Sequence, residues 1–316
     1  MLKLVILIIY FAVLIGIGLY CRKHATDVNG FVLGGRSVGP WLTAFAYGTS
    51  YFSAVVFVGY AGQFGWKYGI AATWAGIGNA IIGSLLAWVV LGRRTRIMSQ
   101  HLDSATMPQF FGKRFGSNPL KIGASVIIFI FLIPYTASLY NGLSRLFGMA
   151  FNIDYSVCII IMATLTAIYV IAGGYMATAI NDFIQGIIML FGIIAVIAAV
   201  IHSKGGFMSA LQGLANVSDP AVSDTPGIFA SFFGPDPFNL LCVVILTSLG
   251  TWGLPQMVQK FYAIDNEASI QKGTVISTIF ALIVSGGCYF LGGFGRLFSD
   301  QIDVKANGFD SIIPTM

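Results

Sequence analysis

The most informative polar residues of this sequence form a hydroxyl-rich stretch inside an apolar segment. The stretch contains Thr49, Ser50 and Ser53, and it directly follows Gly48. Thr49 and Ser53 share one helical face if the segment is helical, because residues four positions apart are neighbours on a helix. Hydroxyl oxygens, together with backbone carbonyls freed where a helix is interrupted, are ligands that a hard cation accepts. The same small residues also allow two helices to pack closely, so packing alone is the alternative interpretation.

A second stretch echoes the first, about 200 residues later in the chain. The run Gly250-Thr251-Trp252-Gly253-Leu254-Pro255 places glycine and proline in the middle of another apolar segment. Unpaired backbone groups are tolerated in lipid only where they face protein or a wet cavity. In secondary transporters, paired interruptions at corresponding places in two structural repeats mark the solute and ion site. The pair therefore predicts a binding site near the middle of a membrane bundle.

The elements that must position these residues are transmembrane helices. The chain of 316 residues is 57% hydrophobic and 9% charged, whereas a soluble domain carries about 25% charged residues. Eight apolar segments approach or exceed the roughly 20 residues that a helix needs to cross a bilayer: 4–20, 41–64, 70–92, 122–147, 155–172, 183–201, 238–258 and 273–294. None of them contains Asp, Glu or Lys. The sequence predicts an all-α integral membrane protein with about eight transmembrane helices.

The distribution of basic residues predicts the orientation of these helices. If the N-terminus lies outside, the inside loops are 21–40, 93–121, 173–182 and 259–272, and they hold eleven of the 17 Lys and Arg residues. The positive-inside rule favours this N-out arrangement in the cell membrane. The net charge of +5 does not indicate nucleic-acid binding, because the basic residues lie in short loops between apolar segments.

Three motifs resemble those of the sodium:solute symporter family, and most of all its bacterial sodium/proline branch. They are Phe31-x-Leu33-Gly34-Gly35-Arg36-Ser37-x-Gly39-Pro40-Trp41, Gly173-Gly174-Tyr175-Met176-Ala177 with Asp182 and Gln185, and Gly253-Leu254-Pro255-Gln256 with Lys260-Phe261. The resemblance runs through the whole chain, and the motifs keep their order and spacing. It implies an inverted-repeat fold of five plus five helices, preceded by one extra helix.

The resemblance also implies a division of the chain. Residues 1–40 would hold the extra helix and a cytoplasmic connector, and residues 41–201 the first repeat. Residues 202–237 contain four of the ten prolines and read as an extracellular loop. Residues 238–316 would begin a second repeat that stops early, so the chain is expected to be the N-terminal portion of a transporter whose missing C-terminal helices are its partner.

The family's site residues carry over by position. Backbone carbonyls of Thr49 and Phe52 would bind sodium, the only metal ion or cofactor expected. The resemblance, together with the hydroxyl stretch, assigns the solute to Ser50, Ser53, Tyr135, Thr247, Thr251 and Pro255. The chain departs from the sodium/proline branch at Tyr51, where that branch has Asp, and at Thr247 and Thr251, where it has aromatic residues.

Two charged residues are expected at the cytoplasmic side. Arg36 and Asp182 would belong to an inner gate, and the alternative interpretation makes them helix-end caps, with Asp182 the N-cap of the sixth span. Gly173 and Gly174 between the fifth and sixth spans would form a helix C-cap and a turn.

The function predicted from these observations is sodium-coupled symport of a small organic solute, with an amino acid such as proline favoured. The 316-residue chain alone is not expected to transport, because each repeat supplies one wall of the site. The alternative is a transporter-like membrane sensor that binds a solute without moving it. An enzyme is disfavoured, because the sequence shows no intramembrane carboxylate pair, histidine cluster or nucleophile beside a base. The expected partners are the solute, sodium and the lipid bilayer.

Overall fold

The computed structural model describes residues 2–151, 153–304 and 308–316, and across these ranges the chain is almost entirely helical. Its longer helices are α1 (Leu2–Cys21), α3 (Pro40–Tyr51), α4 (Ala61–Tyr68), α5 (Thr73–Gly78), α6 (Arg93–His101), α7 (Met107–Phe115), α8 (Asn118–Phe151), α9 (Tyr155–Ser203), α10 (Phe207–Ala215), α11 (Pro237–Leu249), α12 (Pro255–Ala263) and α13 (Glu267–Gly292). Short segments join them: η1 (Arg22–His24), α2 (Val28–Leu33), η2 (Gly34–Arg36), η3 (Val55–Tyr60), η4 (Gly69–Ala72), η5 (Asn79–Leu86), η6 (Trp88–Gly92), η7 (Ile228–Ala230), η8 (Gly250–Gly253), η9 (Gly295–Phe298), η10 (Phe309–Ser311) and α15 (Ile312–Thr315).

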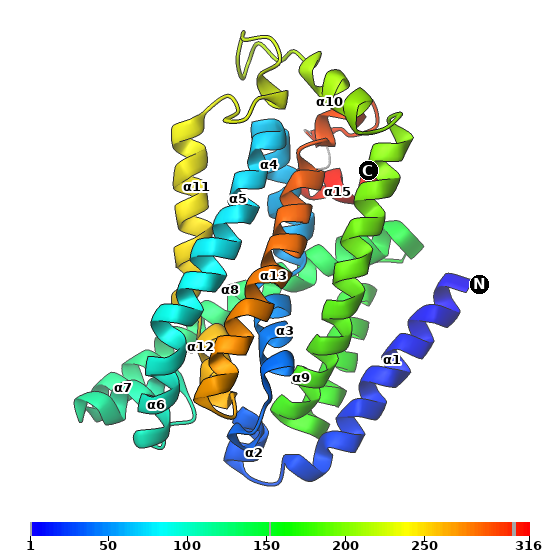
Figure 1. The fold of residues 1–316 in the computed structure, drawn as a ribbon. Coiled ribbons are helices and arrows are strands. Elements are labelled where there is room, and N and C mark those ends of the chain that lie inside the picture. The colour runs from blue at the N-terminus through cyan, green and yellow to red at the C-terminus, as the bar shows by residue number, and fades with distance from the viewer. Residues whose placement is uncertain (1, 152, 305–307) are drawn as a thin grey trace.

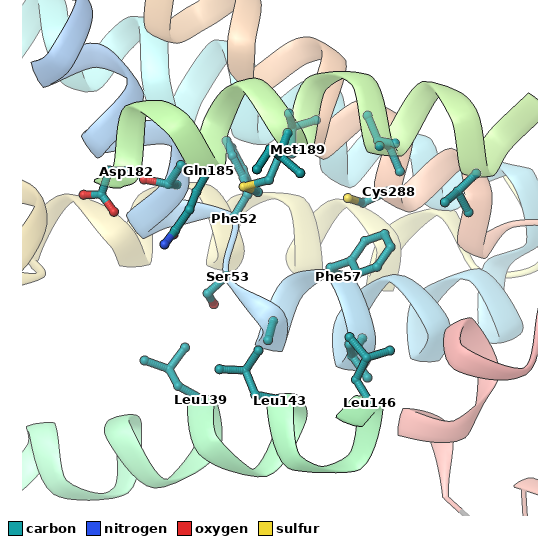
Figure 2. Close-up of a pocket in the computed structure, with 18 of the residues that line it drawn as sticks. Phe52, Ser53, Phe57, Leu139, Leu143, Leu146, Asp182, Gln185, Met189 and Cys288 are labelled. Atoms are coloured by element: carbon teal, nitrogen blue, oxygen red, sulfur yellow. The ribbon is translucent and has the colours of Figure 1, made fainter. Parts of the chain in front are cut away.

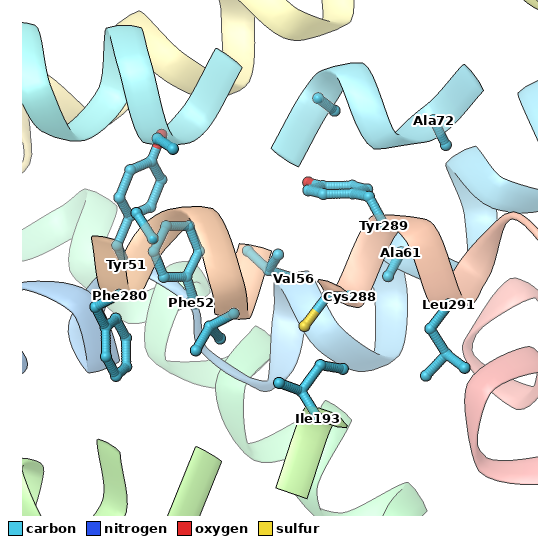
Figure 3. Close-up of a cluster of buried hydrophobic side chains, with 14 of the residues drawn as sticks. Tyr51, Phe52, Val56, Ala61, Ala72, Ile193, Phe280, Cys288, Tyr289 and Leu291 are labelled. Carbon is cyan, nitrogen blue, oxygen red and sulfur yellow. The ribbon is translucent and has the colours of Figure 1, made fainter. Parts of the chain in front are cut away.

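A four-part bundle forms the core of the molecule. It consists of α3–α4, α5–α6, α11–α12 and α13, which contact one another along their length (Figure 1). Figure 3 shows side chains from this core, where Tyr51 and Phe52 lie near Phe280 of α13. A Cβ atom on Gly65 would lie 2.0 Å from the backbone of Gly292, so α4 and α13 meet without an intervening side chain. Such close approach between small residues is a general means of joining membrane helices.

A second group, α1, α8 and α9, lies beside the bundle (Figure 1). Helix α9 contains 49 residues, and as a straight helix it would be about 74 Å long, more than twice a bilayer core. It changes direction at Gly174, whose φ of 58° and ψ of −149° are not helical. A Cβ atom on Gly174 would lie 2.8 Å from the carbonyl oxygen of Phe31, so glycine is needed both for the backbone angles and for the close approach.

The structure corrects the sequence prediction between the fifth and sixth spans. The expected loop over 173–182 is helical on both sides of Gly174, so a single residue makes the turn. The expected connector 93–121 contains two short helices, α6 and α7, which lie with α2 at one end of the bundle, while α10 caps the opposite end (Figure 1).

Four helices of the described residues are long and apolar enough to cross a membrane, and a fifth crossing results if the bent pair α11–α12 is one span. One of the four, Tyr155–Ser203, covers two of the spans predicted from the sequence. Another, Val55–His101, runs from η3 to α6 and covers the predicted span 70–92 and the last part of 41–64. The count of eight spans and the five-plus-five repeat stay predictions. The apolar window of α8 has no buried residue, so this helix presents its side chains to the surroundings of the molecule.

Candidate ion and solute site

The predicted interruption in the second span is present in the structure. Helix α3 ends at Tyr51, and Phe52 has a φ of −98° and a ψ of 64°. The amide of Phe52 still donates to the carbonyl oxygen of Gly48, at 2.9 Å, while the amides of Val56 and Phe57 both donate to that of Ser53. Because the regular ladder stops here, backbone groups and hydroxyls at the break are available to a bound species.

A cavity of about 950 Å³ opens at this break (Figure 2). Its polar end contains Thr49, Ser50, Ser53, Asp182 and Gln185. The rest of the lining is mostly apolar and comes from α1, α3, η3, α8, α9 and α13, for example Ile6, Phe57, Leu139, Leu143, Leu146, Met189 and Cys288. In Figure 2 the Ser53 side chain points into the space between α9 and the leucines of α8.

Five of the ten residues predicted from the sequence line this cavity: Thr49, Ser50, Phe52, Ser53 and Asp182. Thr49 donates its hydroxyl to the carbonyl oxygen of Phe45 at 2.9 Å, which leaves the hydroxyl oxygen able to accept or coordinate. The sequence thus located one wall of the cavity, because its signal was a local run of hydroxyls beside a glycine.

Thr247, Thr251 and Pro255 belong to the second interruption, at which α11 and α12 meet at an angle of 54°. The Thr247 hydroxyl donates to the carbonyl oxygen of Val243 at 2.9 Å, and the Thr251 hydroxyl to that of Ser248 at 3.0 Å. Both hydroxyls are therefore used inside the bundle. Neither residue lines the cavity at Ser53.

Tyr135 also lies outside this cavity. Pro255, the first residue of α12, lies outside it as well. Ser53 therefore lines the cavity, whereas Tyr135 and Pro255 do not.

Asp182 forms an ion pair that the sequence analysis did not identify. Its carboxylate lies 3.6 Å from the Lys260 ammonium, and the two side chains are 21% and 8% exposed. The ammonium also lies 5.0 Å from the centre of the Tyr175 ring. Asp182 is in the interior of α9, so the interpretation of Asp182 as a helix N-cap is wrong. The ion pair joins α9 to α12 of the bundle. The available sequence signal was that Lys260 is the one charged residue of the short helix α12.

Arg36 makes helix-end contacts. Its guanidinium donates to the carbonyl oxygens of Ser99, Ser104 and Tyr262 and to the Ser99 hydroxyl, at 2.8–3.3 Å. These carbonyls lie in the last turns of α6 and α12 or just beyond, where a cation is favourable. Burial lowers the pKa of the Arg36 guanidinium, and the nearby Arg96 lowers it further. Its φ of 55° follows two glycines that are also left-handed, so these contacts hold a strained backbone in place.

Groups of three or more His, Cys, Asp or Glu side chains that could hold a metal ion are absent from the residues that the structure describes. The break of α3 itself offers carbonyl and hydroxyl oxygens. Such ligands suit an alkali or other hard cation better than a transition metal.

Comparison with known proteins gives the site a context. The model of the sodium:solute symporter family matches residues 31–305. The osmoregulated proline transporter OpuE of Bacillus subtilis (strain 168) is 29% identical over 299 residues, which covers 94% of this chain and 59% of that protein. A sodium/proline symporter of Staphylococcus aureus (strain NCTC 8325 / PS 47) is 29% identical, over 99% of this chain and 60% of that protein.

A solved structure shows the same fold. It is the substrate-bound, outward-open state of a Na⁺-coupled sialic acid symporter, with a TM-score of 0.77 and 17% sequence identity. The match covers 100% of this chain and 65% of the solved chain. This chain therefore spans about three fifths of the length of the curated relatives that it matches.

Proposed function

The chain belongs to the sodium:solute symporter family, a family of transporters rather than enzymes, and on that premise we propose that this multi-pass membrane protein takes part in sodium-coupled symport of a small organic solute. The observation that carries the proposal is the broken helix α3, whose hydroxyls face a cavity of about 950 Å³. One Na⁺ ion moving down about 100 mV releases about 2.3 kcal/mol. A tenfold sodium gradient adds about 1.4 kcal/mol, and the two terms drive accumulation of roughly several hundredfold.

Sodium would bind at the break of α3. The backbone carbonyls of Thr49 and Phe52 are the proposed ligands, and the hydroxyls of the same stretch add neutral oxygens. The geometry that supports this is the departure of Phe52 from helical angles, since a regular helix uses its carbonyls internally. Lipid excludes water here, so an ion that leaves its hydration shell needs such oxygens in return.

The solute would bind beside sodium, with Ser50 and Ser53 as its polar contacts. The cavity is polar at one end and apolar along the rest, which fits a small amphipathic molecule. An amino acid such as proline is the favoured candidate, and two relatives bear names that refer to proline. Tyr135, Thr247, Thr251 and Pro255 are proposed to approach the solute in other states of the transport cycle, because alternating access moves one helix group against the other.

The moving parts would be the bundle and the group formed by α8 and α9. Residues 41–201 would form the first repeat, and residues 238–316 would form the start of the second. The N-terminus and the 202–237 segment would both lie outside the cell. The pair between Asp182 and Lys260 joins the two groups, so it is the proposed inner gate. It has to separate whenever α12 moves away from α9. Arg36 would hold the adjoining helix ends together at the same side.

The test replaces Ser53 with leucine in the intact protein and measures sodium-dependent uptake. We expect uptake to be lost while the amount of protein in the membrane is unchanged, because leucine would occupy the polar end of the cavity. Ser138→Leu is the matched control, since Ser138 is exposed on α8 and its hydroxyl donates to the carbonyl oxygen of Tyr135 in the same helix. Wild-type uptake kinetics in Ser53→Leu would contradict the proposed site. Sodium-dependent solute binding by the wild-type protein without any uptake would favour a sensor instead.

A further inference from the structure

One buried amide connects all four parts of the bundle. Asn79, the first residue of η5, is 1% exposed. Its side-chain oxygen lies within hydrogen-bond distance of three hydroxyls, those of Tyr51 at 3.2 Å, Thr247 at 3.1 Å and Ser248 at 3.1 Å. Its side-chain nitrogen donates to the Ser285 hydroxyl at 3.3 Å. These partners come from α3, α11 and α13, and both ends of the amide are used by the protein itself.

The partners of Asn79 lie directly before the two helix interruptions. Tyr51 is the last residue of α3, and the non-helical Phe52 follows it. Thr247 and Ser248 lie in the last turn of α11, just before η8 and the bend into α12. The Tyr51 hydroxyl also donates directly to the carbonyl oxygen of Thr247, at 2.9 Å. Asn79 thus touches each broken helix in the turn that precedes its break.

The hydrogen bonds around Asn79 can be satisfied in more than one way. An amide oxygen has two lone pairs, yet three hydroxyls surround this one. Two of the hydroxyls have a second acceptor nearby, since Tyr51 can donate to the Thr247 carbonyl and Thr247 to the Val243 carbonyl. A small displacement of either broken helix can therefore exchange hydrogen bonds while the amide keeps partners on both.

We propose that Asn79 is a positioning residue that holds the two helix breaks in a fixed relation, so that an event at one break is transmitted to the other. The inference rests on the proposed function in one respect, namely that sodium and solute bind at these breaks. It goes beyond that function because Asn79 does not line the cavity at the α3 break. Loss of the link would let the breaks move independently, and each ligand would then have to order its half of the site by itself.

The experiment compares three variants of the intact protein in membrane vesicles. Asn79→Leu removes the shared amide, and Tyr51→Phe removes one hydroxyl while it keeps the ring that stacks on Phe52. Ser84→Ala is the matched control, because it deletes another buried contact between η5 and α13, to Ser277 at 2.8 Å, which does not involve either broken helix. The half-saturating concentrations of sodium and of solute for uptake are measured for each variant. The amount of folded protein in the membrane is measured separately.

We expect both half-saturating concentrations to rise together in Asn79→Leu and in Tyr51→Phe. A rise of about tenfold corresponds to about 1.4 kcal/mol. Ser84→Ala should stay within about twofold of wild type. The double variant Asn79→Leu/Tyr51→Phe should lose less than the sum of the two single losses, because both substitutions remove the contact between Asn79 and Tyr51. If the role of Asn79 were purely structural, Asn79→Leu would lower the amount of folded protein. The protein that still folds would keep the wild-type half-saturating concentrations.

A readout that does not need transport separates this inference from the proposed function. In a variant with its native cysteines replaced, a cysteine introduced as Ser53→Cys reports the mobility of the α3 break through its alkylation rate. Asn79→Leu should raise that rate about tenfold. If the substitution removes about 1.4 kcal/mol from the closed form of the break, the population of the open form rises by that factor. An unchanged alkylation rate together with wild-type half-saturation in Tyr51→Phe would overturn the role of Asn79. Absence of sodium-dependent uptake in the wild type would refute only the proposed function.

Discussion

Neutralising Lys260 should destabilise the protein strongly, because it leaves the Asp182 carboxylate unpaired in a largely buried position. The two charges are 3.6 Å apart, and the side chains are 8% and 21% exposed. At an effective dielectric constant of about 20, their attraction is about 5 kcal/mol. Removing one partner of such a pair typically costs about 3–5 kcal/mol. We therefore expect Lys260→Met to lose about that much free energy of unfolding.

The double variant decides whether the loss comes from the pair itself. Asp182→Asn combined with Lys260→Met leaves no uncompensated charge, so it should recover most of the stability that either single variant loses. Thermal unfolding in detergent of the wild type, the two single variants and the double variant gives the coupling energy between Asp182 and Lys260. Arg93→Met is the matched control, because the Arg93–Glu267 pair has exposed side chains, and its loss should change stability by about 0.5 kcal/mol.

A further variant of the ion pair, Asp182→Ala, tests the proposed gate. Asp182→Ala should lower uptake by a larger factor than it lowers the amount of folded protein, because the residue also lines the cavity. Additive losses in the double variant would refute the reasoning on the pair. Equal losses of folded protein and uptake would refute the gate and leave a purely structural contact between α9 and α12.

Further expected outcomes concern the coupling ion and the turn in α9. Uptake into vesicles should follow an imposed Na⁺ gradient, because the cavity offers hydroxyl and carbonyl oxygens and its one carboxylate, Asp182, is paired with Lys260; uptake that follows an H⁺ gradient alone would contradict this. Gly174→Ala should cost at least about 1–3 kcal/mol, because its backbone angles are essentially restricted to glycine and its Cβ atom would meet Phe31. Gly123→Ala is the control, since a Cβ atom there has nothing within 4 Å. Equal melting temperatures for the two alanine variants would refute the steric argument.

Local chemistry was enough to predict the helical membrane character and both interruptions. Long apolar segments demand a lipid environment wherever they lie in the fold. Glycine and proline act on the backbone at their own position, so the interruption between α11 and α12 lies at Gly250 to Pro255, where the sequence placed it. The first break lies at Phe52, within the hydroxyl stretch, while Gly48 itself stays helical. Ser53 reaches the cavity because it is part of the first break. These features depend on neighbours a few residues away.

The partners of polar side chains were decided by tertiary structure. Asp182 and Lys260 are 78 positions apart, and the sequence suggested an inner gate or a helix cap for Asp182 but did not pair it with Lys260. Thr247 was expected to face solute, yet packing of α11 against η5 directs it to Asn79. The turn between the fifth and sixth spans is made at Gly174 alone. The backbone of Phe31, from a distant segment, packs so closely against Gly174 that only glycine fits there. A buried polar group takes whichever partner the packed helices bring within hydrogen-bond distance, and that choice is made by contacts between residues far apart in the chain.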